Sequence, residues 1–380
     1  MTKKWSSRLT FFAFVVLMVG LGSNDSLRGI FSTIFQEHFS LTTTQLGLIV
    51  TASYIGNLVF LLVGGNLSTR FSKKRVLQVL ILIWMAALAL FAFTSNYTVL
   101  LIGMALALGS STLLNTTMNL ITPLLFATAP GFFVNFLFFT QEIGTSGSQY
   151  ILGSHADGFA FWQHTNLVLL ILGAVAFVLL LFCNVPEEAA DPADTPAQKG
   201  GYDWRIIVPY VLVFGFYFIA EHGVMNWMVA YGVDGLGLPQ ASAAKYLSVF
   251  FGGMMIGRLC LSPLVDKLGA LKSLAAFGGV SCVLYLIGSL GGAVTMPVWA
   301  ISGLSFSILY PTLVMSIRLY FPAQQVSGAA GTILSIASLA DILFNVGFGK
   351  LVDMAGYAVS IRVLPLSVLA FFIVFMLFTK

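Results

Sequence analysis

The sequence describes a protein built for an apolar environment. It has 380 residues, of which 58% are hydrophobic and only 8% are charged, whereas about a quarter of the residues of an ordinary soluble domain are charged. This composition excludes a water-soluble globule. The net charge of +4 is small, and nothing in the sequence points to a nucleic-acid partner.

Twelve apolar runs follow one another along the chain, and a helix needs about 20 such residues to cross a bilayer. The runs contain Gly and Pro freely and lack the sustained alternation of barrel strands, so they predict helices. They lie near 9–34, 45–66, 76–94, 98–121, 132–153, 166–184, 205–231, 244–264, 273–291, 296–320, 328–350 and 361–379. The predicted fold class is an all-α polytopic membrane protein with twelve transmembrane helices.

Basic residues in the short loops indicate the orientation of these helices. Under the twelve-span assignment almost all Lys and Arg fall on one side, with Lys350 and Arg362 as the main exceptions. Cytoplasmic loops carry such an excess of Lys and Arg. We therefore predict a multi-pass protein of the cytoplasmic membrane with both termini in the cytoplasm.

The chain divides near its middle. Residues 185–204 are rich in Pro, Ala and acidic residues and predict a flexible cytoplasmic linker. They separate an N-terminal half, 1–184, from a C-terminal half, 205–380, each with six apolar runs. This symmetry is typical of secondary transporters, in which two pseudo-equivalent bundles hold the substrate site between them.

A repeated loop supports this division. Residues 64–75, GGNLSTRFSKKR, join the second and third runs, and residues 262–272, SPLVDKLGALK, join the eighth and ninth. Both resemble the conserved loop of the major facilitator superfamily, although Thr69 replaces the acid of the first copy. The resemblance implies a gating latch that uses Arg70, Asp266 and Lys267. The alternative for the first copy is a basic loop that only sets topology.

Within that superfamily the chain resembles the fucose–proton symporter family. The matching motifs are Asn24-Asp25, Asn115-x3-Asn119, Asn135-x8-Gly144 and Tyr310-Pro311-Thr312. The resemblance implies sugar transport coupled to protons, with Asn24 and Tyr310 among the substrate contacts. Two positions depart from the family pattern: Asn115 stands in place of a membrane carboxylate and Gln141 in place of an Asn that contacts sugar.

Four acids lie inside the apolar runs: Asp25, Glu142, Glu221 and Asp341. A charged side chain in the bilayer costs about 2.5–3.5 kcal/mol on insertion scales, so it normally faces a cavity or a partner. We predict that Asp25, Glu142 and Asp341 take part in proton coupling. The alternative for Asp25 is a fixed ion pair with Arg28, three residues further on.

Amide side chains accompany these acids. In the fifth run Glu142, Thr145, Ser146 and Gln149 form one polar helix face, with Gln141 beside it, and the fourth run presents Asn115 and Asn119. Amides both donate and accept hydrogen bonds, which suits neutral ligands rich in hydroxyl groups. We expect these residues to bind substrate; the alternative is hydrogen bonding between helices.

The second half adds a polar cluster and an aromatic residue. Glu221, His222, Asn226 and Trp227 lie within two turns of the seventh run. Trp227 is a candidate platform for the apolar face of a sugar or, alternatively, an interfacial residue. We interpret His222 as a hydrogen-bonded packing residue; the alternative is a proton relay. In the eleventh run Asn345 follows Asp341 by one turn. Asp341 either replaces the acid missing at position 115 or pairs with an arginine, Arg318 or Arg258.

Other classes of function find no support in the sequence. There is no GxxxxGK[ST] loop for ATP, and no HExxH, GxSxG or metal-spaced His/Cys set. We therefore expect no enzyme activity, no cofactor and no metal. The predicted function is secondary active transport by a monomer, as a proton-coupled symporter for a sugar or a similar neutral hydroxylated molecule. The alternative is a proton-driven efflux antiporter for amphipathic drugs.

Overall fold

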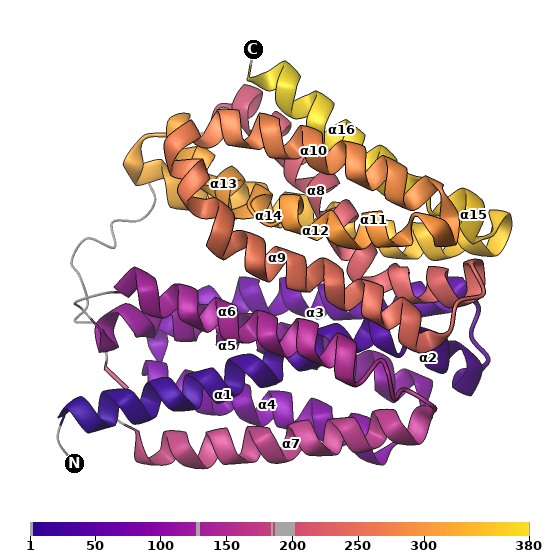
Figure 1. Ribbon diagram of the computed structural model, residues 1–380. Coiled ribbons are helices and arrows are strands. Elements are labelled where there is room, and N and C mark those ends of the chain that lie inside the picture. Colours follow the sequence, from indigo (N-terminus) through magenta and orange to yellow (C-terminus); the bar gives the residue numbers. More distant parts are fainter. Residues whose placement is uncertain (1–2, 127–129, 184, 187–201, 380) are drawn as a thin grey trace. The chain divides into compact units, whose positions relative to one another are not determined.

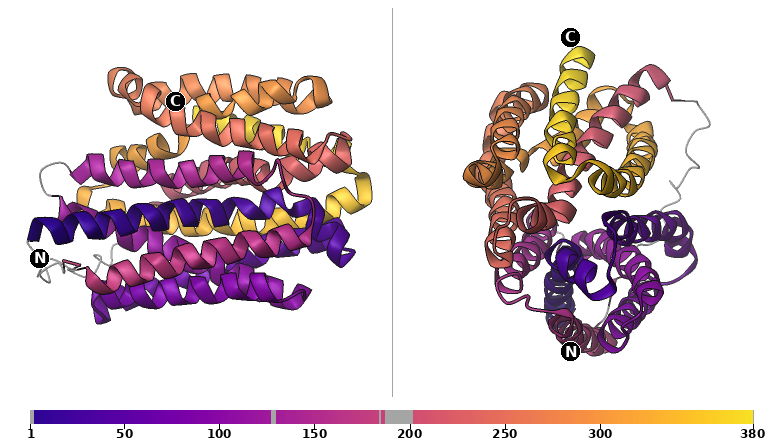
Figure 2. Two further views of the ribbon diagram at one scale, coloured as in Figure 1. Left: turned by 60° about the horizontal axis from the view of Figure 1, so that its bottom comes forward. Right: turned by 90° about the vertical axis from the view of Figure 1, so that its right-hand side faces the viewer.

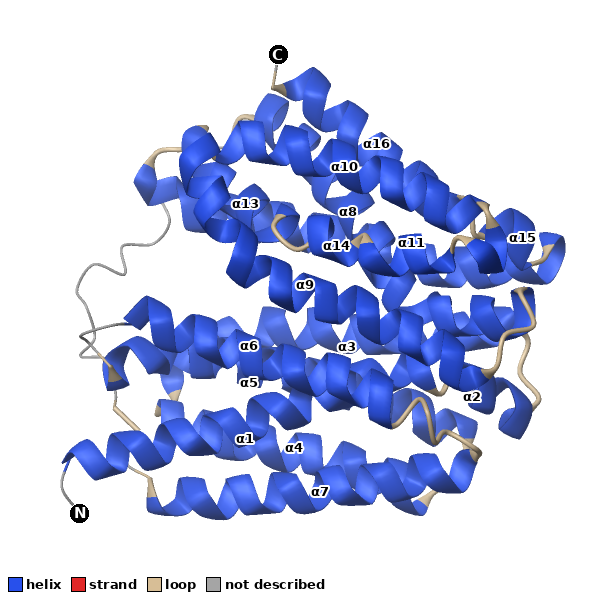
Figure 3. Ribbon diagram, in the orientation of Figure 1, coloured by secondary structure: helices blue, strands red, loops and turns tan. Residues whose placement is uncertain are grey.

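The computed structural model describes residues 3–126, 130–183, 185–186 and 202–379. In this part of the chain the regular elements are all helices, as Figure 3 shows, and no strand occurs among the described residues. The chain divides into two compact units, 1–190 and 191–380. The division falls inside the predicted linker 185–204, of which residues 187–201 lie outside the described part.

The first unit contains seven described helices, drawn from indigo to magenta in Figure 1. They are α1 (Lys3–Ile30), α2 (Ser32–Phe39), α3 (Thr43–Arg70), α4 (Lys73–Phe93), α5 (Tyr97–Leu125), α6 (Pro130–Ile151) and α7 (Phe159–Phe182). All but the short α2 correspond to one of the six predicted runs. The first run, 9–34, differs in detail, because α1 ends at Ile30 and α2 begins at Ser32.

The second unit contains the remaining helices. They are α8 (Trp204–Ala230), the π-helical turn η1 (Tyr231–Gly235), α9 (Gln240–Leu268), α10 (Ala270–Leu290), the short turn η2 (Gly292–Val294), α11 (Met296–Ile301), α12 (Gly303–Phe306), α13 (Leu309–Ser316), the turn η3 (Ile317–Leu319), α14 (Ala323–Ala355), α15 (Tyr357–Ser360) and α16 (Val363–Phe378). In the right-hand view of Figure 2 the helices of each unit are seen close to end-on, as a bundle.

Eleven helical stretches in the described part are long and apolar enough to cross a membrane. They match every predicted run except the fifth, for which the structure has α6. That helix has 22 residues and is about 33 Å long at 1.5 Å per residue, which is enough for one crossing. The prediction of an all-α polytopic membrane protein is confirmed.

The tenth predicted run, 296–320, is not one helix. It is broken into α11, α12 and α13, and two local causes lie at the breaks. Ser302, Ser305 and Ser307 each donate a side-chain hydrogen bond to the backbone carbonyl three residues earlier, at 2.6, 2.9 and 2.7 Å, which competes with helical bonding. Pro311 has no N–H for the carbonyl of Ser307, four residues before it.

The two units use the same pattern of helix pairs. In the first, α1 packs against α6 and α7, α3 against α5, and α4 against α7; in the second, α8 packs against α14 and α16, α9 against α11 and α12, and α10 against α16. Numbered as spans within each half, these are the pairs first–fifth, first–sixth, second–fourth and third–sixth. The halves are therefore structural repeats, as the hydropathy symmetry predicts.

Glycines bring the backbones of α1 and α6 into contact. A Cβ at Gly22 would lie 2.1 Å from the carbonyl oxygen of Gln141, and a Cβ at Gly144 would lie 2.2 Å from that of Val19. Ser23 Oγ donates to the Gly144 carbonyl at 3.3 Å, and Thr145 Oγ1 donates to the Gly22 carbonyl at the same distance. This contact sets the polar residues of the two helices side by side.

In the second unit, two glycines of α9 bring that helix close to the backbone of α12. A Cβ at Gly253 would lie 3.0 Å from the amide nitrogen of Leu304, and one at Gly257 would lie 2.6 Å from the Leu304 carbonyl oxygen. The GxxxG spacing at 253–257 therefore marks a close approach of two helices, as this spacing commonly does in membrane proteins.

The α1–α6 contact predicts a difference between two glycines of one helix. Gly144→Ala places a methyl group against the backbone of α1, and overpacking of this kind costs about 1–3 kcal/mol. A Cβ at Gly147 meets nothing within 4 Å, so Gly147→Ala is the matched control. Thermal unfolding of the purified protein in detergent should show a lower midpoint for Gly144→Ala only; equal midpoints for the two variants would contradict the contact.

Candidate functional site

Asp25 is the acidic centre of the first unit. Its Oδ2 atom accepts a hydrogen bond from Ser111 Oγ of α5 at 3.0 Å. Its Oδ1 atom is buried, and no donor among the described residues bonds it. Arg28, one turn along α1, is buried and lies near enough for its charge to act on the carboxylate. Its guanidinium carbon is 5.5 Å from the centre of the Tyr54 ring on α3, a cation–π distance.

The predicted amides of α5 and α6 form one hydrogen-bonded chain. Asn119 Nδ2 donates to Asn115 Oδ1, and Asn115 Nδ2 donates to Gln141 Oε1, both at 2.6 Å. All three side chains are partly exposed. The chain ends on Asn119 Oδ1, a buried acceptor that has no donor within the described part of the protein. A buried acceptor without a donor lowers the stability of the folded protein by about 1–3 kcal/mol.

Asn24 and the α6 stripe complete the predicted set of the first unit. Asn24 is buried, and its Oδ1 atom accepts from the indole Nε1 of Trp84 on α4 at 3.3 Å. Along α6, Glu142 and Ser146 are partly exposed, whereas Gln149 is fully buried. Neither side-chain polar atom of Gln149 has a hydrogen-bond partner among the described residues.

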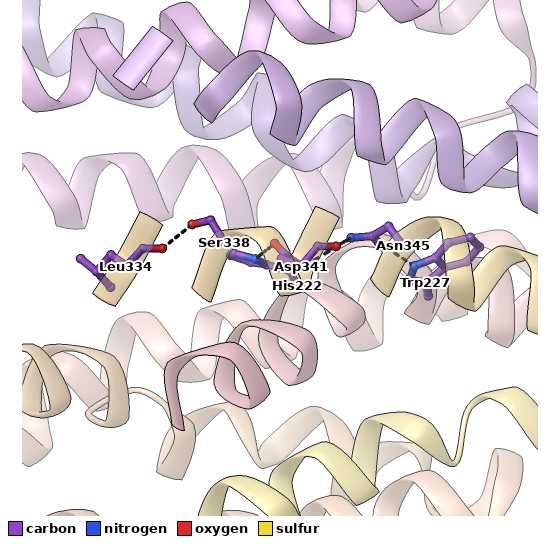
Figure 4. Close-up of polar contacts among 6 residues, drawn as sticks. All are labelled: His222, Trp227, Leu334, Ser338, Asp341 and Asn345. Atoms are coloured by element: carbon purple, nitrogen blue, oxygen red, sulfur yellow. Dashed lines mark hydrogen bonds and ion pairs between the residues drawn. The ribbon is translucent and has the colours of Figure 1, made fainter. Parts of the chain in front are cut away.

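In the second unit a polar chain connects α8 and α14 (Figure 4). His222 Nδ1 lies 2.5 Å from Asp341 Oδ2, and Trp227 Nε1 donates to Asn345 Oδ1 at 2.9 Å. Asn345 in turn donates from Nδ2 to the backbone carbonyl of Asp341 at 2.8 Å and to its Oδ1 atom at 3.4 Å. The partner of Asp341 is therefore His222, and neither of the arginines considered from the sequence.

Trp227 has no exposed surface, and its ring packs against Phe348 with centroids 4.8 Å apart. Its indole nitrogen is committed to Asn345. Trp227, the residue expected to stack on a sugar, is therefore buried among the packed side chains of the second unit. Asn226, the residue before it, is also buried.

A second polar group lies beside this chain. Glu221 on α8 and Arg258 on α9 are near enough to act electrostatically on the hydroxyls of Tyr217 and Tyr310. The rings of Tyr217 and Tyr310 are stacked with centroids 6.0 Å apart. The predicted residues Glu221 and Tyr310 are both partly exposed, and the structure brings them together.

The gating residues lie at the ends of their helices. Arg70 is the last residue of α3 and Asp266 lies in the last turn of α9, but the side chains of both lie outside the described part. Lys267 is exposed.

The sequence did not predict the partners that hold Asp25, Asn24 and Arg28 in place. Ser111, Trp84 and Tyr54 come from helices other than those of the groups they contact. Ser111 carried a signal, because it precedes Asn115 by one turn and so shares its helix face. Trp84 and Tyr54 lie in apolar runs without any such signal.

Comparison with known protein families decides the class. The family model described as Major Facilitator Superfamily matches residues 10–344, which is most of the chain. The protein belongs to the major facilitator superfamily. Proteins of this superfamily are membrane transporters of twelve helices, so the predicted fold is confirmed.

Three proteins illustrate the similarity. The L-fucose-proton symporter of Escherichia coli (strain K12) is 24% identical over 76% of this chain and 75% of its own length. The cis,cis-muconate transport protein of Acinetobacter baylyi (strain ATCC 33305 / BD413 / ADP1) is 24% identical over 72% of this chain and 70% of its own length. A solved structure of a D-xylose-proton symporter superposes with a TM-score of 0.78 at 16% identity, covering 98% and 97% of the two chains. The D-xylose-proton symporter and this protein therefore share one fold.

The buried position of Trp227 predicts a structural role. Trp227→Phe keeps most of the ring but removes the only hydrogen that the indole donates to Asn345. A buried acceptor that loses its donor costs about 1–3 kcal/mol, so we expect the unfolding midpoint of the purified protein to fall. Trp204, which is 58% exposed at the start of α8, supplies the control Trp204→Phe. A fall of the same size in the control would argue against the role.

Proposed function

We propose that this transporter is a proton-coupled symporter for a sugar or a similar neutral hydroxylated molecule. It works as a monomer in the cytoplasmic membrane, with both termini in the cytoplasm. One observation carries the choice of substrate: buried oxygen acceptors of the first unit, Asp25 Oδ1 and Asn119 Oδ1, have no donor among the described residues. Sugar hydroxyls supply such donors, and they also accept bonds from amide N–H groups.

The charges of the first unit support a neutral substrate over an anion. Asp25 and Glu142 contribute two carboxylates to the polar positions of α1 and α6, and the basic residue beside them on α1 is Arg28, since Lys3, Lys4 and Arg8 lie at the start of that helix. An anionic substrate would meet two like charges, whose repulsion is strong in an environment of low dielectric. The Acinetobacter relative is named for muconate, a dicarboxylate, and the Escherichia relative for fucose and protons. The balance of charges therefore favours a neutral substrate such as fucose over a dicarboxylate.

Asp25 can couple the proton to the sugar through its Oδ1 atom. When the carboxyl group is protonated, Oδ1 carries a hydrogen that it donates to a ligand oxygen; when ionised, Oδ1 accepts from a ligand hydroxyl. Ser111 bonds the other oxygen and so holds the carboxyl group in place. Arg28 compensates the charge of the ionised form. Loss of the proton thus changes the hydrogen bond that the substrate meets.

The remaining predicted residues complete the proposal. Glu142, Gln149, Asn24 and Gln141 on α1 and α6, and Glu221, Asn226, Tyr310 and Asn345 in the second unit, act on substrate directly or hold the residues that do. Arg70, Asp266 and Lys267 form the gating latch. The proposal assigns Trp227 to the positioning of Asn345, because its ring is packed against protein.

The function is tested by uptake into proteoliposomes that contain the purified protein. The panel comprises L-fucose, D-glucose, D-galactose, cis,cis-muconate and a hydrophobic cationic dye, each measured with and without an imposed pH gradient. We expect one of the sugars to accumulate and its accumulation to collapse with the gradient. Accumulation of muconate, or dye export with indifference to every sugar, would reject the proposal.

Replacement of Asp25 predicts a loss of coupling. A pH difference of one unit supplies about 1.4 kcal/mol per proton, and therefore about tenfold accumulation for each proton carried with the sugar. With the membrane potential clamped at zero, Asp25→Asn should lower the sugar plateau by about tenfold per unit of pH difference, while exchange of labelled sugar still occurs. Asp157→Asn, at an exposed loop position, serves as the control. An unchanged plateau in Asp25→Asn would show that Asp25 carries no proton.

The amide chain predicts an effect on binding. Asn115→Leu keeps the size of the side chain but breaks both bonds of the chain, and a lost hydrogen bond with a stranded partner costs about 1–3 kcal/mol. Sugar binding to the purified protein should therefore weaken by about five- to 150-fold, measured by calorimetry or equilibrium dialysis. Thr116, the next residue of α5, is exposed, so Thr116→Val is the matched control. Wild-type affinity in Asn115→Leu would show that these amides only join helices and do not bind sugar.

A further inference from the structure

His222 and Asp341 form a close pair of ionisable groups on two different helices. The pair joins α8 to α14, with Nδ1 and Oδ2 separated by 2.5 Å. The two members differ in their access to water: the side chain of His222 is 25% exposed, and that of Asp341 only 3%. A proton that enters or leaves this pair therefore does so at the histidine.

The indole of Trp227 fixes which end of the Asn345 amide faces Asp341. An indole nitrogen only donates hydrogen bonds, so the amide atom that lies 2.9 Å from it must be the oxygen. The NH₂ group consequently points back along α14, where it donates to the backbone carbonyl of Asp341 and to Oδ1. Figure 4 shows this sequence of contacts from Trp227 through Asn345 to Asp341 and His222.

This arrangement holds Asp341 as an acceptor at both oxygens. Oδ1 receives the amide of Asn345, and Oδ2 faces His222, so the hydrogen between the pair belongs on Nδ1 of the imidazole. The neutral imidazole then has its lone pair on Nε2, and Nε2 is the atom that gains and loses a proton. A buried carboxylate selects the tautomer of a catalytic histidine in the same manner. The ring of Phe218 stacks on the imidazole at 5.4 Å and 8° and restricts its rotation.

Other ionisable groups lie on α8 and on the elements that pack against it. Glu221 precedes His222 on α8, Arg258 approaches this region from α9 and Tyr310 from α13. Asp234 lies in η1, about three turns beyond His222. On α14 the next ionisable residues after Asp341 are Lys350 and Asp353, more than two turns away, and α16 has no ionisable residue. His222 is the one member of this set whose unperturbed charge changes between pH 5 and 8.

We propose that Nε2 of His222 carries a second proton of the transport cycle, with Asp341 as its positioning residue. This rests on the proposed symport of sugar and protons. The step is simple proton binding: the neutral imidazole takes one proton at Nε2 to become imidazolium, and releases it there. Each half of the protein then contains its own proton site, Asp25 on the first span of one half and His222 on the first span of the other.

The first test reads the tautomer directly and needs no substrate. His38, His155 and His164 are replaced by Gln, which leaves His222 as the single histidine of the full-length protein, and the ¹⁵N resonances of its ring are recorded across the pH range. We expect the neutral ring to carry its hydrogen on Nδ1, and Asp341→Asn to abolish that preference. A neutral ring with its hydrogen on Nε2 in the protein that retains Asp341 would overturn the proposal.

The second test counts protons from the sugar plateau. At a pH difference of one unit and zero membrane potential, two protons support about hundredfold accumulation and one proton about tenfold. We expect His222→Gln to lower the plateau from about hundredfold to about tenfold, and Asp25→Asn/His222→Gln to show no accumulation. His38 lies on α2, outside the candidate spans, so His38→Gln should match the wild type.

The outcomes separate this inference from the proposed function. A wild-type plateau in His222→Gln, or complete loss of accumulation in Asp25→Asn alone, would refute the second proton and leave sugar symport intact. A wild-type protein that transports none of the sugars would refute the symport, while the resonances of His222 would still test the tautomer.

Discussion

The structure depends on one constraint: hydrocarbon offers no hydrogen-bonding partner, so polar groups inside the spans must find partners within the protein or on a bound solute. Most of those described here do. Ser111 bonds Asp25, Trp84 bonds Asn24, and Trp227 bonds Asn345. The partners come from neighbouring helices, and the bonds therefore also tie each bundle together at the level of its acids.

The ionisable groups of the two halves lie on corresponding spans. Asp25 and Glu142 lie on α1 and α6, the first and fifth spans of their half, and His222 and Asp341 lie on α8 and α14, which are the first and fifth spans of theirs. In the first half, glycines bring the two backbones into contact, and Asp25 retains an oxygen without a protein donor. In the second half the first span carries His222, which is paired with Asp341. The repeat thus supplies two similar helix pairs that carry different ionisable groups.

The sequence predicted what depends on composition and on helical periodicity. Hydropathy located the twelve spans, and the one-turn spacing of Asn115 and Asn119 correctly placed them on one helix face, where they are hydrogen-bonded. The sequence did not predict contacts between residues that are far apart along the chain. His222 and Asp341 are 119 residues apart, and no local pattern connects them. The break of the tenth run followed from Pro311 and three serines, whose effect on a helix depends on competing bonds that hydropathy does not register.

The central claim is that protons cross the membrane together with sugar, and the direct measurement is the pH outside proteoliposomes when sugar is added. The vesicles contain the purified protein in weak buffer, without an imposed gradient, with potassium and valinomycin to clamp the potential. Sugar entering down its own gradient should draw protons inward, so the account predicts that the external medium becomes alkaline, and that it does so only with vesicles that contain the protein. Sugar entry with a constant external pH would contradict it.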